Sequence, residues 1–263
     1  MSRVKISEGC LHVVQRGAGH PLLLVHGFPL DHQMWQGQIV ELSQEFRVIA
    51  PDLRGFGLSD ETTPAVTMER FADDLAELLQ ELGVDEPVAF CGLSMGGYIA
   101  WQFWRRHARL LSHLIVCDTR SAPDSPEAAQ ARYDSAQRVL AEGTSTLIET
   151  MIPKLFSDHT RRQNPAVVAA TRKVMEAARP VGVAAALRGM AQRVDATAWL
   201  SEIHVPTLVI CGQEDVIAPV AEMEHIARAI PQAEWVVIPA SGHMAPLEDP
   251  LHVNKAIRGF LQA

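Results

Sequence analysis

The sequence predicts an α/β fold with a doubly wound, mostly parallel sheet and an inserted helical cap. Short runs rich in leucine and β-branched residues alternate with longer amphipathic stretches, as buried parallel strands alternate with helices. One long interval contains no strand-like run. The length of 263 residues and the hydrophobic content of 48% allow a large buried core. We therefore expect one α/β core with one insertion.

The predicted elements begin with a hairpin. Residues 4–7 and 10–15 alternate in polarity on either side of Glu8 and Gly9, which is typical of two half-exposed antiparallel strands. Short apolar runs then predict six buried strands, at residues 21–26, 47–51, 87–91, 114–118, 207–211 and 235–238. Amphipathic stretches predict the helices that connect them, at residues 33–44, 67–82, 95–107, 219–229 and 251–261.

The insertion is predicted from an Ala-rich, amphipathic interval that is broken only by prolines. We expect residues 1–118 and 204–263 to form the core, and residues 119–203 to form a helical cap, called the cap segment below. Residues 119–200 carry 11 Lys or Arg and 8 Asp or Glu, whereas the rest of the chain carries 12 and 23. A basic cap could select anionic substrates, for instance through Arg188 and Arg193, but solvated charges on helix faces are the commoner explanation.

Composition and charge exclude several classes of function. The formal net charge of −8 argues against nucleic-acid binding, which needs clustered Lys and Arg to neutralise phosphates. The N-terminal residues lack the apolar core of a signal peptide, and no apolar stretch reaches the roughly 18 residues of a membrane-spanning helix. We therefore expect a soluble, cytoplasmic protein with neither a membrane nor a nucleic acid as partner.

The sequence predicts no cofactor and no metal site. Because no Gly-x-Gly-x-x-Gly follows the first core strand, a dinucleotide is not expected. His26, Asp31 and His32 share a loop but lack the ligand spacing of a zinc site. The four cysteines form no Cys-x-x-Cys pair, and we interpret them as buried thiols: Cys10, Cys91, Cys117 and Cys211.

The nucleophile is predicted from Gly92-Leu93-Ser94-Met95-Gly96, which spells G-x-S-x-G between a predicted strand and a predicted helix. This is the pattern of a nucleophile elbow, a tight turn that exposes the serine hydroxyl. Ser94 could instead be a helix N-cap, but an N-cap does not require glycines on both sides. We therefore predict that Ser94 is a nucleophile.

A serine nucleophile needs a base, and the base needs a third group that orients it. His243 lies in a loop just after the last predicted strand, and Asp215 lies in the loop after the strand at 207–211. Both loops belong to the carboxyl edge of the sheet, and the chain order Ser, Asp, His is that of a known hydrolase arrangement. Asp118, at the end of the strand at 114–118, is a rival for the acid.

The loop after the first core strand, His26-Gly27-Phe28-Pro29, is predicted to supply an oxyanion hole. The backbone amides of Phe28 and Met95 could both point at the oxygen that becomes negative during attack, whereas Pro29 has no amide hydrogen. We interpret His26 as a hydrogen-bonded brace of this loop and not as a base. We assign a structural role to four residues of the loop after the second core strand: Asp52, Arg54, Gly55 and Gly57.

These motifs together resemble the α/β-hydrolase family over nearly the entire chain. The elbow Gly-Leu-Ser-Met-Gly-Gly and the helical cap are similar to those of bacterial 3-oxoadipate enol-lactonase-like serine hydrolases, although those enzymes commonly carry Ser-Asn where this chain has His26-Gly27. The resemblance implies that Ser94 is the nucleophile, His243 the base and Asp215 the orienting acid.

We predict a serine hydrolase that cleaves a small carboxylic ester or lactone through an acyl-enzyme. The alternatives of the same fold are a 3-oxoadipate enol-lactonase, a carbon-carbon bond hydrolase and a perhydrolase. A dehalogenase is disfavoured because the elbow carries Ser94 and not an aspartate. The alternative of another class is a non-catalytic binding protein. Five apolar residues are expected to line the pocket: Phe28, Trp35, Leu155, Phe156 and Met190.

Overall fold

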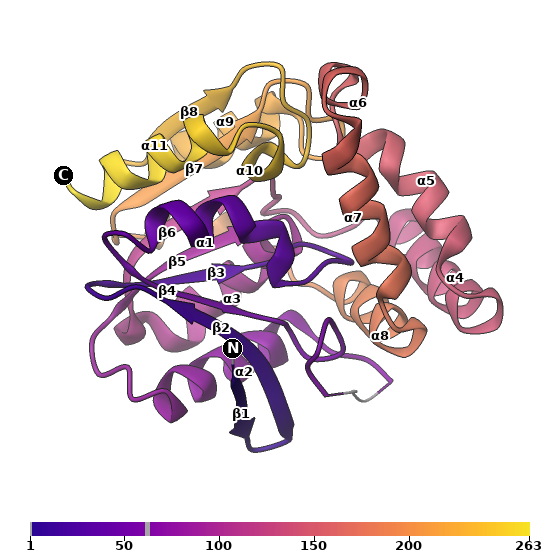
Figure 1. The fold of residues 1–263 in the computed structure, drawn as a ribbon, viewed down its shortest axis with the longest axis horizontal. Coiled ribbons are helices and arrows are strands. Elements are labelled where there is room, and N and C mark those ends of the chain that lie inside the picture. The colour runs from indigo at the N-terminus through magenta and orange to yellow at the C-terminus, as the bar shows by residue number, and fades with distance from the viewer. Residues whose placement is uncertain (1, 61–63) are drawn as a thin grey trace.

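A computed structural model describes residues 2–60 and 64–263. An eight-stranded sheet forms its centre, in the order β1-β2-β4-β3-β5-β6-β7-β8 (Figure 1). The two N-terminal strands pair antiparallel and β3 to β8 are parallel to one another, which confirms the predicted doubly wound, mostly parallel sheet. The strands are β1 Ser2–Ile6, β2 Gly9–Arg16, β3 Pro21–Val25, β4 Arg47–Pro51, β5 Val88–Leu93, β6 Leu111–Cys117, β7 Thr207–Gly212 and β8 Glu234–Ile238.

Both faces of the sheet are buried, which explains the continuous apolar runs of its strands. Leu22 and Leu24 of β3 pack into one apolar cluster, whereas Leu23 and Val25 pack into the other. This alternation follows from the two-residue period of a strand. One face is covered by α2 Met68–Glu81, α3 Met95–His107 and α9 Val220–Ala229, and the other by α1 Gln36–Leu42, α10 Ala245–Glu248 and α11 Pro250–Leu261.

The predicted helix at 33–44 is wrong in its bounds. The structure has a 3-10 helix, η1 His32–Trp35, followed by the shorter α1. Asp31 caps η1, since its side chain accepts a hydrogen bond from the amide of Gln33. Two further short 3-10 helices, η2 Ala108–Leu110 and η3 Thr197–Glu202, were not predicted.

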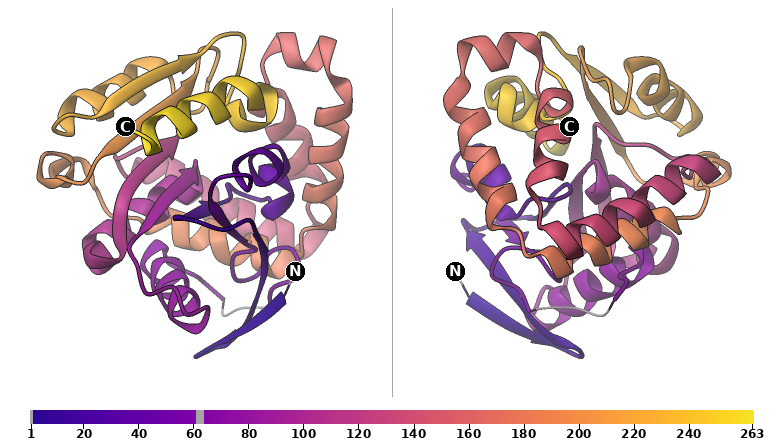
Figure 2. Two further views of the ribbon diagram at one scale, coloured as in Figure 1. Left: turned by 60° about the vertical axis from the view of Figure 1, so that its left-hand side comes forward. Right: turned by 90° about the vertical axis from the view of Figure 1, so that its right-hand side faces the viewer.

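The cap segment forms five α-helices between β6 and β7, which lie together on the right of Figure 1 and stay together in both views of Figure 2. Three of them begin with a proline in the first turn, where the missing amide hydrogen costs nothing. Pro126, Pro165 and Pro180 therefore start helices, whereas Pro153 lies inside another of the five. The helices are α4 Pro126–Glu142, α5 Ser145–Leu155, α6 Asp158–Gln163, α7 Pro165–Ala177 and α8 Pro180–Ala191.

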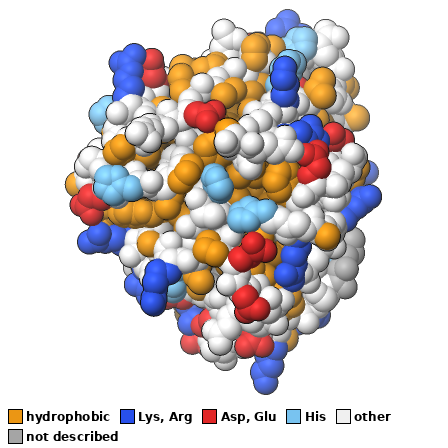
Figure 3. Space-filling view, turned by 90° about the vertical axis from the view of Figure 1, so that its left-hand side faces the viewer, with side chains coloured by type: hydrophobic (Ala, Val, Ile, Leu, Met, Phe, Trp, Pro, Cys, Tyr) orange, Lys and Arg blue, Asp and Glu red, His pale blue; other side chains and the backbone are white. Residues whose placement is uncertain are grey.

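Charged side chains of both signs are interspersed on the face of the molecule farthest from the cap segment (Figure 3). Among the described residues, no helix has the length and apolar character needed to cross a membrane. Three of the four cysteines are buried, as predicted, whereas Cys10 on β2 is only half-buried. All four thiols are free.

Candidate active site

Ser94 sits at the turn between β5 and α3 with φ 53° and ψ −108°. A non-glycine residue in this left-handed region is strained, and the surroundings must hold it there. The two glycines of the motif allow the turn, because a Cβ on Gly92 would lie 2.3 Å from the carbonyl oxygen of Gly96, and one on Gly96 would lie 2.4 Å from that of Val25. Close backbone approach therefore explains the G-x-S-x-G pattern.

The neighbouring strand anchors the turn. The amide of Ser94 donates a hydrogen bond to the carbonyl of Cys117 at 2.9 Å. The hydroxyl of Thr119 donates to the carbonyl of Ser94 at 2.7 Å. Sequence reasoning missed this role of Thr119, because no local pattern marks a side chain that reaches a turn 25 residues away.

The structure brings the three predicted side chains together in one chain of hydrogen bonds. The hydroxyl oxygen of Ser94 lies 2.8 Å from Nε2 of His243, and Nδ1 of His243 lies 2.8 Å from Oδ2 of Asp215. Because the carboxylate can only accept, Nδ1 carries the hydrogen and Nε2 is left to accept from the serine. This assignment follows from the hydrogen-bond network. His243 and Asp215 are buried and Ser94 is half-buried.

The carboxylate of Asp215 is surrounded by donors. Its Oδ1 accepts hydrogen bonds from the amides of Ile217 at 2.7 Å and Ala218 at 3.0 Å, while Oδ2 faces His243. Its side chain is fully buried. The turn after β7 thus fixes the direction of this carboxylate with two backbone amides and aims its second oxygen at the imidazole.

Asp118, the rival acid, also lies at the carboxyl edge of the sheet but does not bind His243. Its Oδ1 accepts a hydrogen bond from the amide of Gly212 at 2.7 Å. Among the described residues, its Oδ2 has no hydrogen-bond partner. Complete burial raises the pKa of Asp118 well above its ordinary value, and the nearby charge of Asp215 raises it further. The geometry therefore favours Asp215 as the partner of His243.

The predicted oxyanion loop approaches Ser94 closely. A Cβ on Gly27 would lie 3.6 Å from the Cβ of Ser94. Within residues 2–60 and 64–263, no hydrogen bond occupies the backbone amide of Phe28 or of Met95. Both amides are thus unoccupied, as an oxyanion hole requires, and their role in one stays a prediction.

The side chain of His26 stabilises the oxyanion loop through hydrogen bonds to two backbone groups. The amide of Leu53 donates to its Nε2 at 2.9 Å, so Nδ1 carries the hydrogen and donates to the carbonyl of Gly27 at 2.9 Å. Complete burial lowers the pKa of His26, which favours the same neutral form. The bracing role predicted for His26 is confirmed, and both of its ring nitrogens are occupied.

Comparison with known proteins decides the family. The model of the α/β-hydrolase fold matches residues 20–250, which is most of the chain. This chain belongs to the α/β-hydrolase family. A curated relative, the 3-oxoadipate enol-lactonase 1 of Acinetobacter baylyi, is 30% identical over 234 residues, or 89% of this chain and 85% of the relative.

Two solved structures are similar to this α/β hydrolase in both fold and sequence. A thermophilic esterase from Thermogutta terrifontis with malate bound is 47% identical, with a TM-score of 0.97 over 100% of this chain and 98% of the esterase. The enol-lactonase from Burkholderia xenovorans LB400 is 28% identical, with a TM-score of 0.93 over the full length of both chains. The predicted fold and the predicted resemblance to enol-lactonases are confirmed.

The side chains predicted to line the substrate pocket of this α/β hydrolase are all buried: Phe28, Trp35, Leu155, Phe156 and Met190. The first and the last of them belong to one apolar cluster, and the other three belong to the second. Leu155 lies beside the loop of His243, because its carbonyl accepts a hydrogen bond from the amide of Met244 at 3.1 Å. The binding role of these five residues stays a prediction.

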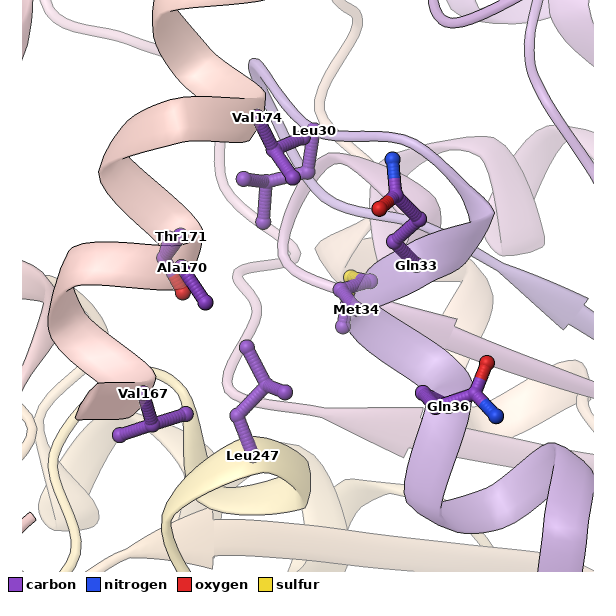
Figure 4. Close-up of a pocket in the computed structure, with 9 residues that line it drawn as sticks. All are labelled: Leu30, Gln33, Met34, Gln36, Val167, Ala170, Thr171, Val174 and Leu247. Carbon is purple, nitrogen blue, oxygen red and sulfur yellow. The ribbon is translucent and has the colours of Figure 1, made fainter.

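A separate cavity of about 240 Å³ lies between the cap segment and the core (Figure 4). Of the described residues that line it, none is Ser94, Asp215 or His243. Met34 connects it to the oxyanion loop, since its sulfur accepts a hydrogen bond from the amide of Gly27 at 3.3 Å. The lining comprises Leu30, Gln33, Met34 and Gln36 after β3, Val167, Ala170, Thr171 and Val174 of α7, and Leu247 of α10.

A second buried His–Asp cluster braces the core of this α/β hydrolase. Asp52 lies 2.9 Å from Nδ1 of His12 and 2.6 Å from Nδ1 of His32. Although burial by itself favours the neutral acid, hydrogen bonds from the side chain and amide of His32 help to lower the pKa of Asp52 to about 2. The structural role predicted for Asp52 is thus confirmed. His12, His32 and Asp52 each have an atom that could bind a metal ion, and these atoms lie within 4.8 Å of one another. The spacing of the residues in the sequence does not reveal this proximity. The absence of a metal site therefore stays a prediction.

The two arginines considered for anion selection have protein partners. The guanidinium of Arg193 is buried, forms an ion pair with Asp124 at 2.7 Å and lies 4.4 Å from the centre of the Tyr98 ring. Arg188 donates a hydrogen bond to the carbonyl of Pro64 at 2.8 Å. Asp124 offsets the charge of Arg193, so the structure gives no support to anion selection through that side chain.

Proposed function

We propose that this α/β hydrolase cleaves small carboxylic esters or lactones with Ser94 as nucleophile. The observation that carries the proposal is the continuous chain of two 2.8 Å contacts from Ser94 through His243 to Asp215. A hydroxyl, an imidazole and a buried carboxylate in this order form the arrangement that activates a serine.

In the proposed first half-reaction, the oxygen of Ser94 attacks the carbonyl carbon while its proton passes to Nε2 of His243. Asp215 stabilises the resulting imidazolium. The carbonyl oxygen becomes negative and accepts hydrogen bonds from the amides of Phe28 and Met95. When the tetrahedral intermediate collapses, the carbon–oxygen bond to the alcohol breaks and the alcohol takes the proton from Nε2. The acyl group remains on Ser94.

In the second half-reaction, water takes the place of the alcohol. It loses a proton to Nε2 of His243, attacks the acyl carbon and releases the acid, and the proton returns to Ser94. In a lactone the alcohol and the acid belong to one molecule, so the product is a single hydroxy acid. Both substrate classes are supported by relatives, because the esterase and the enol-lactonases share the fold at substantial identity.

The Ser94→Ala substitution tests the proposal. Removing the nucleophile is expected to lower kcat by about 10⁶-fold, as in other serine hydrolases. The assay compares wild type and variant on p-nitrophenyl acetate, on aliphatic esters and on lactones, including 3-oxoadipate enol-lactone. A wild type as inert as Ser94→Ala toward the whole panel would favour a non-catalytic binding protein. Peracid formation from acetate and peroxide, measured in parallel, examines the perhydrolase alternative.

A further inference from the structure

Glu248, the last residue of α10, holds the loop that carries His243. Its Oε1 accepts hydrogen bonds from the amides of Gly242 at 2.8 Å and Met244 at 3.2 Å, the two residues that flank the histidine. Its Oε2 accepts from the amide of Ser157 at 2.9 Å. Bonds from amides to an ionised acceptor are stronger than neutral ones. One carboxylate thus ties both sides of His243 to α10.

The third amide belongs to the cap segment. Ser157 follows α5 and caps α6, and its hydroxyl also donates to the carbonyl of Ala240 at 2.8 Å. The two backbones lie in contact here, because a Cβ on Gly242 would lie 2.7 Å from the nitrogen of Ser157 and 3.0 Å from the carbonyl carbon of Phe156. The cap segment and the histidine loop therefore meet at one half-buried carboxylate.

The carboxylate of Glu248 is bound by backbone amides. Among the described residues, no Lys, Arg or His lies within ion-pair distance of Glu248. Its negative charge is matched by three backbone amides instead, and amides are fixed in direction by the chain. A charge held in this way restrains the backbone of residues 242–244, whereas a surface ion pair would leave that backbone free.

We infer that Glu248 is a positioning residue for His243 and the joint through which the cap segment is fixed to the base. This inference rests on the proposed function, since it assigns no step of the reaction to Glu248 itself. When the restraint is removed, the imidazole spends less time at 2.8 Å from Ser94. A misplacement of about 1 Å is enough to cost on the order of 10²-fold in rate.

The two oxygens of Glu248 allow the two roles to be separated. Glutamine keeps one carbonyl oxygen and replaces the other oxygen with a donor. Its oxygen is expected to face Gly242 and Met244, where it keeps two bonds, and its nitrogen to face the amide of Ser157, where one bond is lost. Glu248→Gln should therefore preserve the position of His243 and loosen the cap segment, whereas Glu248→Ala should release both.

The experiment measures kcat and KM for p-nitrophenyl acetate with wild type, Glu248→Ala and Glu248→Gln. We expect Glu248→Ala to lower kcat by about 10²-fold with KM within about threefold, and Glu248→Gln to stay within about fivefold of wild type. Asp73→Asn is the matched control, because Asp73 joins α2 to Arg106 and His107 on α3. It should cost stability and leave kcat unchanged.

A second measurement does not depend on turnover. The Nδ1 hydrogen of His243, bonded to Asp215, should give a low-field proton NMR signal that is assigned by its loss in Asp215→Asn. The signal should be retained in Glu248→Gln and be lost or broadened in Glu248→Ala. If Glu248→Ala does not fold, Glu248→Asp, whose carboxylate is one methylene shorter, replaces it with an expected loss of about tenfold in kcat.

The outcomes separate the two proposals. An inert wild type would contradict the proposed function, and the NMR signal would still test Glu248. An active wild type, an inactive Ser94→Ala and a folded Glu248→Ala with unchanged kcat and an unchanged signal would overturn the inference alone. So would a Glu248→Gln variant that loses as much kcat as Glu248→Ala, because the two bonds to the histidine loop would then not matter.

Discussion

Asp215 and Asp118 follow neighbouring strands and lie at the same edge of the sheet, yet their surroundings differ. The carboxylate of Asp215 faces two backbone amides and the imidazole of His243. Among the described backbone amides, that of Gly212 donates to the carboxyl group of Asp118. Position at the end of a strand therefore does not decide which acid serves the base, whereas the number of donors aimed at each carboxyl group does.

The two groups also influence each other. Their carboxyl oxygens and the sulfur of Cys211 lie within 4.8 Å of one another in the buried interior. Two carboxylates this close disfavour double ionisation. Burial raises the pKa of Asp118 well above its ordinary value. The surroundings of Asp118 therefore favour its neutral form.

Of the changes to these two acids, Asp215→Asn is expected to have the largest effect. An amide in place of the carboxylate favours the wrong tautomer of His243 and leaves the imidazolium without its counter-charge, so kcat should fall by about 10⁴-fold. The measurement is kcat for p-nitrophenyl acetate, with thermal unfolding to show that the variant is folded. If Asp118→Asn caused this loss while Asp215→Asn did not, the roles of the two acids would be reversed.

The elbow could be predicted from the sequence because its pattern, G-x-S-x-G, is local. The whole pattern lies within residues 92–96, although one of the contacts that it permits, from Gly96 to the carbonyl oxygen of Val25 on β3, is not local. The alternation of apolar runs and amphipathic stretches likewise reports which residues face a buried sheet. The sequence alone does not distinguish Asp215 from Asp118 as the partner of His243, because both residues follow a strand. The difference lies in the turn after β7, which directs the amides of Ile217 and Ala218 at the carboxylate of Asp215.

Three other features could not be predicted from the sequence: the contacts of Glu248, the pocket lining and the cluster around Asp52. The partners of Glu248 are backbone amides, which every residue except proline possesses, so no residue type marks the contact. Apolar character cannot separate pocket residues from core residues, and all five predicted pocket side chains are buried, so their binding role stays a prediction. The cluster around Asp52 joins three segments that are far apart in the chain, which spacing within one loop cannot reveal.

An intermediate effect, on stability, is expected from Asp118→Ala. The amide of Gly212 loses its partner in a buried site, and an unpaired buried donor costs about 1–3 kcal/mol in the free energy of unfolding. Catalysis should change little, with kcat within about threefold, since His243 keeps Asp215. Chemical denaturation and ester hydrolysis measure the two quantities. A large loss of kcat in folded Asp118→Ala would show that Asp118 supports the base.

The smallest effect is expected from Asp118→Asn, and it lies in the pH dependence of stability. The pKa of Asp118 in the folded protein is raised from its ordinary 3.8, so the folded state binds more protons than the unfolded state at pH values between the two. The free energy of unfolding of the wild type therefore loses a contribution as the pH rises through this interval. Asparagine resembles the neutral acid and cannot ionise.

The stability of Asp118→Asn relative to wild type should accordingly increase as the pH rises above about 4, while kcat stays within about threefold. Denaturation at several pH values measures the difference, and a relative stability that falls with rising pH would mean that Asp118 is ionised in the folded protein.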